Sequence, residues 1–562
     1  MTDKTFKVAA APGVLASAWA LFITIAGVAG YSMREVAPLF WGATGLAIVA
    51  FLVVALRARI NLLALYIVPF AASFIVLLPW IYRGMTLFPG TWFWDGWSYL
   101  AFGQAFLKYP LDTSLPSIVS PMYELAISWA FKTRFITAGL LALFSASPIS
   151  SGETQAAAGY LLFFYLFTFA CSIGALGAIL FPAKPLIKWG YVVFGTVSGY
   201  MITALHANNY DQLLAMALLP LLVALALQLQ WDNRRQAFTL GVVAAGVLTV
   251  YPELAPANLG LPFVVIIWRI WREQPHNKSL LKNVALCAGV FVLAASPAIY
   301  SLSSFFIEQL AKAYDVVKGR PGENYFLQFY YPQCAPGALW SLFAPMKTPA
   351  CEGWTAFVSG ALGAVLSVTA LYGSLRAAKT LLPIVLCAFL PFMGGMIMLI
   401  VSRYDYGAYK LFAVGFPFWA ALVVFGVTQI RTRWARPVVF GAALCYAALM
   451  GYRVVEIDSG ARFKTVEVFR EPLKDIPAGS TIALKIADHL SYEWAAYYLR
   501  DDNLITIEGN LAYLSEPKSV RPTGNVSYFV SDKGAHSCWG DPISRSEAYA
   551  VFRAPGQTDC SP

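Results

Sequence analysis

The chain has 562 residues, of which 59% are hydrophobic and 12% are charged. Soluble domains carry about 25% charged residues, and the mean hydropathy here is +0.62. These values exclude a cytosolic enzyme, a disordered chain and a secreted disulfide scaffold. The net charge of +10 would suit a nucleic-acid-binding protein, but the membrane topology accounts for it differently.

Apolar runs of roughly 20 residues, long enough to cross a bilayer, recur along the chain. We predict a polytopic α-helical membrane protein with about thirteen spans, the shorter of which can be accommodated by tilt. The first is long and has no cleavage site, so we interpret it as a retained helix. The spans are predicted near residues 10–30, 38–56, 61–82, 156–181, 189–205, 211–230, 237–251, 259–271, 283–302, 354–375, 380–401, 410–430 and 437–453.

The distribution of Lys and Arg predicts the orientation. If the N-terminus is inside, the inner connections hold seventeen basic and three acidic residues, and the rest of the chain has a net charge of −4. Basic residues gather in cytoplasmic connections, so we predict an inner (cytoplasmic) membrane protein with a cytoplasmic N-terminus. The positive charge then reflects topology rather than a nucleic-acid-binding surface.

This orientation places most of the non-membrane chain in the periplasm or outside the cell. We divide the chain into a transmembrane domain, residues 1–453, with large outer loops at 83–155 and 303–353, and an extracytoplasmic domain, residues 454–562. In the tail, β-branched stretches predict strands at 481–486, 504–508, 526–530 and 548–553, and a helix at 492–500. The fold class is therefore a helical membrane protein with a small α/β domain.

The eight cysteines fit this orientation. Cys334 and Cys351 share one predicted outer loop, and Cys538 and Cys560 lie near the end of the tail. In an oxidising compartment they are expected to form one disulfide in each region. No Cys or His spacing supports a metal site, although the sequence leaves open a metal held by Asp95 with Asp112 or Glu124.

The first outer loop begins with an aromatic stretch, residues 88–99, that contains Asp95. A carboxylate beside aromatic rings at a membrane surface is partly desolvated, which raises its basicity and suits a general base. Trp94 and Tyr99 are candidate stacking surfaces for a sugar or acceptor, and Glu124 and Glu153 are rival bases. Alternatively, Asp95 caps the next helix and the rings form an interfacial belt. Residues 98–108 are predicted to form an amphipathic helix on the membrane surface.

A second candidate group lies at the outer ends of later spans. Arg403 and Lys410 share one short connection and could hold a lipid phosphate and stabilise it as a leaving group; alternatively, Arg403 pairs with Asp405 or Lys410 snorkels. Ionisable residues near membrane depth often mark a cavity. His206 could donate to the phosphate, Asp211 could orient it or a sugar hydroxyl, and Glu253 could add a carboxylate. Alternatively, these residues are polar only because a short turn at the membrane surface requires polar side chains.

An acidic residue in the first large outer loop, a helical surface loop, ten or more spans and an outer C-terminal domain resemble the GT-C superfamily of membrane glycosyltransferases. The resemblance implies that Asp95 is the catalytic base and that the donor is a polyprenyl-phosphate-linked sugar. The acceptor would be a cell-envelope glycan, a lipid or a protein. Two extra spans precede the loop and are interpreted as an N-terminal addition. The loop shows no obvious Asp-x-Asp pair to hold a metal beside a diphosphate, which favours a metal-independent reaction of a monophosphate-linked donor, without a cofactor. The corresponding mechanism is a single displacement that inverts the anomeric centre.

Two other functions remain open. A lipid-linked oligosaccharide flippase or transporter would often show repeated halves, whereas this chain shows no internal repeat and has most of its extramembrane mass on one side. A glycan polymerase or ligase of another membrane family would favour a large outer loop rich in Arg with a His.

The topology predicts an accessibility pattern. A membrane-impermeant thiol reagent applied from outside is expected to label cysteines introduced into the first outer loop and the tail, and to leave positions near Arg433 unlabelled. The reverse pattern would contradict the orientation.

Overall fold

The computed structural model describes most of the chain. The described residues are 2–82, 94–111, 120–129, 135–147, 150, 152–182, 184–206, 209–274, 277–299, 303, 307, 334–342, 353–401, 404–430, 441, 445–446, 448–450, 467–508, 526–532 and 540–553.

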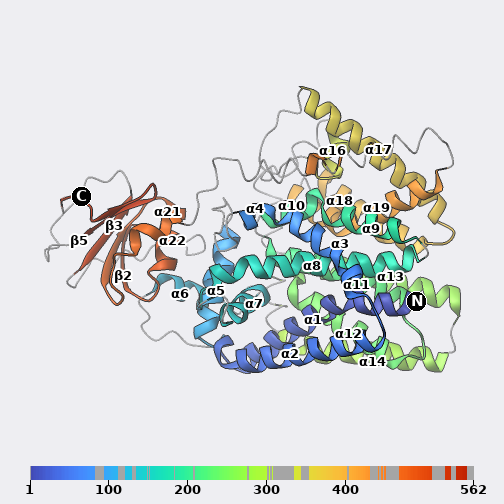
Figure 1. Ribbon diagram of the computed structural model, residues 1–562, viewed down its shortest axis with the longest axis horizontal. Helices are drawn as coiled ribbons and strands as arrows, with labels where there is room; N and C mark the ends of the chain where they lie inside the picture. Colours follow the sequence, from blue (N-terminus) through green and yellow to red (C-terminus); the bar gives the residue numbers. More distant parts are fainter. Residues whose placement is uncertain are drawn as a thin grey trace. The chain divides into compact units, whose positions relative to one another are not determined.

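The protein is a helical membrane protein (Figure 1). Among the described residues, nine helices are long and apolar enough to cross a membrane, and each coincides with a predicted span. They are α1 (Thr2–Val28), α2 (Met33–Arg57), α8 (Thr154–Leu180), α11 (Tyr210–Gln228), α13 (Ala255–Glu273), α14 (Asn277–Ala295), α17 (Gly353–Ala377), α18 (Leu382–Ile400) and α19 (Asp405–Gln429).

The other four predicted spans differ from single long helices. The span at 61–82 is divided into α3 (Leu62–Val76) and α4 (Leu78–Tyr82), and the span at 189–205 into α9 (Pro185–Thr196) and α10 (Gly199–His206). The span at 237–251 is the shorter helix α12 (Arg234–Val250). The span at 437–453 lies mostly outside the described residues.

The chain forms two compact units. Unit 1 comprises residues 1–25, 39–79 and 162–459, and unit 2 comprises residues 26–38, 80–161 and 460–562. Besides the long helices, unit 1 contains α3, α9, α10, α12, the short helices η1 (Pro252–Leu254) and η2 (Ser296–Ala298), and α16 (Ala335–Leu339).

Helices in unit 1 approach one another closely where small residues meet. A Cβ on Gly373 of α17 would lie 2.0 Å from the carbonyl oxygen of Leu422 in α19, and a Cβ on Gly426 would lie 2.5 Å from that of Thr369. No side chain fits between these backbones, so glycine at both positions permits the contact. Such small-residue contacts replace the hydrophobic driving force that is missing between helices in lipid.

A buried arginine closes one helix end in unit 1. Arg269 of α13 donates from Nη1 to the carbonyl oxygens of Ala226 and Leu229, at 3.0 and 2.6 Å. The same guanidinium forms two further hydrogen bonds with Glu273, one turn along α13. The last carbonyls of a helix have no intrahelical partners, so Arg269 satisfies the C-terminus of α11 while its own charge is paired.

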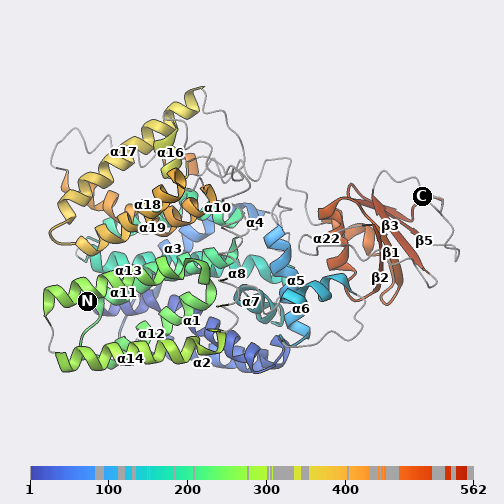
Figure 2. The ribbon, with the colours of Figure 1, turned by 180° about the vertical axis from the view of Figure 1, so that it is seen from behind.

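Unit 2 contains a five-stranded sheet with strand order β2-β1-β3-β5-β4. Strands β2, β1 and β3 are parallel, whereas β5 is antiparallel to β3 and β4. Both views place α22 beside the sheet (Figures 1 and 2). The predicted α/β tail is confirmed, with β4 as an additional short strand. The strands are β1 (Thr481–Lys485), β2 (Asn503–Glu508), β3 (Tyr528–Asp532), β4 (Ser544–Arg545) and β5 (Tyr549–Arg553); the helices are α21 (Glu467–Arg470), η4 (Glu471–Leu473) and α22 (His489–Tyr498).

The first outer loop forms three helices, α5 (Trp94–Lys108), α6 (Pro121–Trp129) and α7 (Ile136–Ser145). Residues 96–107 of α5 are all buried, because α6, α7 and α22 pack against this helix. The predicted helix at 98–108 is confirmed, but it is buried by other helices instead of exposing one face. Protein covers its polar side as well as its apolar side.

Arg500 joins the tail to the start of α8 within unit 2. Its side chain is 8% exposed and donates to Glu153 Oε1 at 2.6 Å and to the Tyr497 carbonyl at 2.9 Å. Tyr497 and Tyr498 form further hydrogen bonds with Thr154 and Gln155. Next to it, burial raises the pKa of Asp501, but the hydrogen bond from Lys108 and the charge of Arg500 outweigh burial and hold that pKa below its ordinary value.

We expect Arg500→Ala to destabilise this junction by about 2 kcal/mol, because hydrogen bonds to charged groups are lost. Amide hydrogen exchange in α22 should then accelerate roughly thirtyfold. The matched control is Lys108→Ala, which removes a pair with Asp501 whose side chains are 46% and 57% exposed and should cost less than about 1 kcal/mol. Equal effects of the two variants would contradict the assignment.

Candidate functional site

Three connections of unit 1 meet around Lys410. Lys410 lies in the second turn of α19, and its Nζ is 3.0 Å from Oε2 of Glu253 in η1. The Tyr406 hydroxyl, one turn earlier, donates to Asn209 Oδ1 at 3.3 Å, just before α11. The connections α10–α11, α12–α13 and α18–α19 are therefore linked by side chains at one end of these helices. We call Lys410, Glu253, Tyr251, Tyr406 and Asn209 the Lys410 cluster.

The local sequence explains why Glu253 is presented here. Helix α12 ends at Val250, and Pro252 lacks the amide hydrogen that would continue it. One turn of 3₁₀ helix follows before α13 begins at Ala255. Glu253 thus stands in a tight turn between two helices.

The local sequence also explains the shape of the α18–α19 connection. The Tyr404 amide donates to the Met398 carbonyl oxygen at 3.0 Å, which folds the chain back at the end of α18. A Cβ on Gly407 would lie only 2.4 Å from Cδ1 of Tyr404. Glycine at this position lets the Tyr404 ring pack against the first turn of α19. This contact positions the start of α19, and with it Lys410.

The Lys410–Glu253 pair is largely removed from solvent. The two side chains are 11% and 15% exposed, and the ammonium also lies 4.2 Å from the ring centre of Tyr406 and 5.2 Å from that of Tyr251. Lys410 therefore does not snorkel away from the protein. Ionisable residues in membrane-spanning helices are costly and commonly serve binding or transport. A buried cation that already holds one carboxylate can accept another anion in its place.

The remaining outer candidates lie close in sequence to this cluster. Asp211 is fully buried in the first turn of α11, two residues after Asn209. His206 is the last residue of α10, but its side chain lies outside the described part of the chain, as does the whole of Arg403. Their predicted phosphate contacts stay predictions.

The candidates from the first loop belong to unit 2. Asp95 and Trp94 begin α5, although their side chains are not among those the structure describes. Tyr99 is buried in the same helix with 5% exposure, and Glu124 lies in the first turn of α6, which packs against α5. Asp95 thus stands at the N-terminus of a helix, a position compatible with both the capping interpretation and the base.

Sequence reasoning missed the residues that hold α5 in place. Trp97, two residues after Asp95, donates from Nε1 to the Glu493 carbonyl of α22 at 2.8 Å. Thr154 donates to the Leu100 carbonyl of α5 and also bonds the Tyr497 hydroxyl. The tail domain therefore fixes the helix that carries Asp95. Only the aromatic character of Trp97 signalled a role in the sequence.

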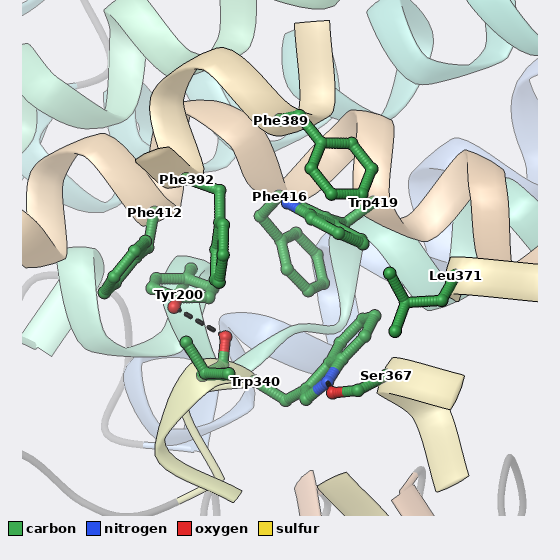
Figure 3. Close-up of a pocket in the computed structure, with 10 residues that line it drawn as sticks. Tyr200, Trp340, Ser367, Leu371, Phe389, Phe392, Phe412, Phe416 and Trp419 are labelled. Carbon is green, nitrogen blue, oxygen red and sulfur yellow. Dashed lines mark hydrogen bonds between the residues drawn. The ribbon is translucent and has the colours of Figure 1, made fainter. Parts of the chain in front are cut away.

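A second feature of unit 1, an aromatic cavity, has no predicted site residue in its wall. It has a volume of about 240 Å³ and includes Tyr200, Trp340, Phe392, Phe412 and Phe416. Figure 3 shows the rings arranged around it. The Tyr200 hydroxyl donates to the Leu339 carbonyl, and Trp340 Nε1 donates to Ser367. The Tyr200 hydroxyl and the Trp340 indole thus have partners within the wall, and most of the remaining lining is aromatic or aliphatic, so the cavity suits an apolar ligand.

This cavity and Lys410 lie on different sides of α19. Phe412, Phe416 and Trp419 line the cavity and follow Lys410 by two, six and nine residues. At 3.6 residues per turn these positions are rotated from Lys410 by about 180° to 240°. The polar cluster and the aromatic cavity are therefore separate features of unit 1.

The described residues include some of the cysteines and some of the predicted metal ligands. Cys334 is buried and disulfide-bonded; its predicted partner Cys351 lies outside the described residues, as do Cys538 and Cys560, so the pairings stay predictions. Cys171, Cys287, Cys387 and Cys445 are free thiols.

Among the described residues, no group of three or more His, Cys, Asp or Glu side chains could hold a metal ion. Asp112 is not among them.

Comparison with family models and with the sequences of curated proteins gave no match. Among solved structures, the chain is similar to the archaeal oligosaccharyltransferase AglB from Archaeoglobus fulgidus, solved with an inhibitory peptide and a dolichol-phosphate. The identity is 12% and the TM-score 0.45, over 83% of this chain and 69% of AglB. A second structure of the A. fulgidus enzyme, with Zn and sulfate, gives 12% and 0.45 over 83% and 68%.

The arabinofuranosyltransferase AftD from Mycobacteria is also similar, at 13% identity and a TM-score of 0.48. The match covers 85% of this chain but only 36% of AftD, so this chain spans about a third of that protein.

The buried pair predicts a coupled effect on stability. Lys410→Met or Glu253→Gln alone leaves one charge buried without its partner and should lower the free energy of unfolding by about 3 kcal/mol. The double variant should lose clearly less than the sum. Thermal or denaturant unfolding of the purified protein measures this.

The matched control is the Lys474–Glu471 pair of unit 2, whose side chains are 50% and 56% exposed and whose loss should cost less than about 1 kcal/mol. Strict additivity of the two changes at Lys410 and Glu253 would show that the pair is not coupled.

Proposed function

We propose that this protein is a membrane glycosyltransferase that uses a polyprenyl-phosphate-linked sugar. The sugar passes to a hydroxyl group of a cell-envelope glycan, lipid or protein on the extracytoplasmic face. The observation that supports the proposal is the Lys410 cluster, a buried cation paired with a carboxylate at the end of several spans. A lipid-linked anion is the ligand that such a cation in a membrane protein can recruit.

In the proposed first step, the donor phosphate replaces Glu253 as the partner of Lys410. The incoming phosphate brings two or more oxygen acceptors to the ammonium, and charge-assisted hydrogen bonds of this kind are stronger than neutral ones. Tyr251 and Tyr406 keep the ammonium in place through their ring faces. The released Glu253 carboxylate becomes available for a sugar hydroxyl.

The proposed chemical step is a single displacement at the anomeric carbon. The carboxylate of Asp95 takes the proton of the acceptor hydroxyl, whose oxygen forms the new bond to the anomeric carbon. The bond from that carbon to the phosphate oxygen breaks, and its electron pair leaves with polyprenyl phosphate. Lys410 stabilises the charge that develops on the leaving group. Attack from the face opposite the phosphate inverts the anomeric centre.

The position of Asp95 supports its role as the base through the rigidity of its helix. General bases require a fixed geometry, and α5 is held by Trp97 and Thr154 through hydrogen bonds to and from the tail and α8. In this proposal the tail domain supports the helix that carries the base. The aromatic residues of α22 belong to its packing, since Trp494 and Tyr497 are almost completely buried.

The test separates donor binding from chemistry. Asp95→Asn should reduce the rate of sugar transfer by about 10²- to 10⁴-fold and leave binding of polyprenyl phosphate unchanged. Lys410→Met should weaken binding of polyprenyl phosphate roughly tenfold or more but leave binding of uncharged polyprenol unchanged. Single-turnover transfer and equilibrium binding in nanodiscs measure the two effects.

The matched control is Lys379→Ala, which removes an exposed cation from the α17–α18 connection at the opposite ends of the spans. It should alter neither quantity. A well-folded, fully active Asp95→Asn variant would remove Asp95 as the base. Equal binding of polyprenyl phosphate and polyprenol by the unmodified protein would contradict the proposed donor class.

A further inference from the structure

A large cavity of unit 1 lies at the end opposite to the Lys410 cluster. It has a volume of about 1010 Å³, and its walls are formed by α1, α2, α3 and α8 together with the first turns of α12. Lys7 near the start of α1, Leu62 at the start of α3 and Arg235 at the start of α12 all line it. These helix starts lie on the face predicted to be cytoplasmic. We call this feature the α1–α2 groove.

The groove is amphiphilic along its length. Its polar lining is concentrated at one end, where Lys7 and Arg235 lie with Asn233, Gln236 and Thr239 of the α12 N-terminus. The remaining wall is apolar. Among the described residues that line it, two are basic and none is acidic.

The length of the apolar wall matches one leaflet. Along α1 the lining runs from Phe6 to Ala18, which is about 18 Å at 1.5 Å per residue. The hydrocarbon core of a bilayer is about 30 Å thick, so the groove reaches about half of that depth. On the facing helix α2, Ile48 and Leu52 are 45% and 40% exposed, which leaves this wall accessible from the side.

A hydrogen bond between α1 and α3 bounds the groove near its polar end. Pro12 has no amide hydrogen, so the carbonyl of Val8 lacks its usual helical partner. The Tyr66 hydroxyl of α3 donates to this carbonyl at 2.7 Å and fixes α3 against α1 beside the cavity. The groove is therefore bounded by a defined contact between helices.

We propose that the α1–α2 groove binds an anionic phospholipid from the leaflet on the cytoplasmic side. Its phosphate lies between Lys7 and Arg235, and an acyl chain follows the apolar wall between α1 and α2. Basic pockets between helices on this side of a membrane suit anionic head groups. The sugar donor of the proposed function acts at the opposite face, so the groove takes a different lipid from the other leaflet. The bound lipid fills the space beside α2, which has few buried residues.

The experiment uses the purified full-length protein in detergent with added lipid. Phosphatidylglycerol should raise the unfolding temperature in a saturable manner, because a ligand that binds the folded state stabilises it. Phosphatidylcholine and inorganic phosphate should not. The double variant Lys7→Ala/Arg235→Ala should bind phosphatidylglycerol roughly thirtyfold more weakly, since each cation near a membrane surface contributes about a factor of five.

Two further variants make the result specific. The matched control Lys184→Ala/Arg376→Ala removes two cations from the same predicted face but outside the groove and should keep the full response. Ala18→Trp fills the deep end of the groove and should reduce the response although both cations remain. Stabilisation of equal size by phosphatidylcholine or phosphate, or an undiminished response of the Lys7→Ala/Arg235→Ala variant, would overturn the proposal.

Discussion

The ion pair between Lys410 and Glu253 is the interaction on which the candidate site depends. Lipid offers no water to a charge, so each ionised group within the helices of unit 1 requires a partner from the protein. The α12–α13 turn supplies the carboxylate, and the start of α19 supplies the ammonium. Since both charges are costly to bury, retaining them in place of two apolar residues suggests a use beyond stability.

Arg269 shows the other way in which unit 1 resolves the same constraint. Its guanidinium is divided between the carboxylate of Glu273 and the carbonyl oxygens at the end of α11. These hydrogen bonds stabilise the packing of α13 against the end of α11. Lys410, by contrast, contacts the carboxylate of Glu253 and the ring faces of Tyr406 and Tyr251. In the proposed function, the phosphate of the donor takes the place of that carboxylate.

In unit 2, hydrogen bonds of buried side chains hold distant segments of the chain together. Its buried Arg500 links Glu153 to the end of α22, while Trp97 ties α5 to the same helix. These bonds join segments that are about 350 to 400 residues apart in the chain. A helix that carries a candidate base is thereby fixed by the α/β domain at residues 467–553. This gives the α/β tail a structural role in the proposed reaction.

The sequence by itself determined the membrane class, nine of the spans and the α/β tail, because length, apolar periodicity and strand composition are local properties. It also singled out Lys410 and Glu253, since charged residues beside apolar runs stand out. Only the tertiary structure decided that these two residues pair, that α5 is buried rather than lying on a membrane, and that a groove with Lys7 and Arg235 at its mouth exists. Each of these depends on contacts between segments distant in the chain, which no local pattern records.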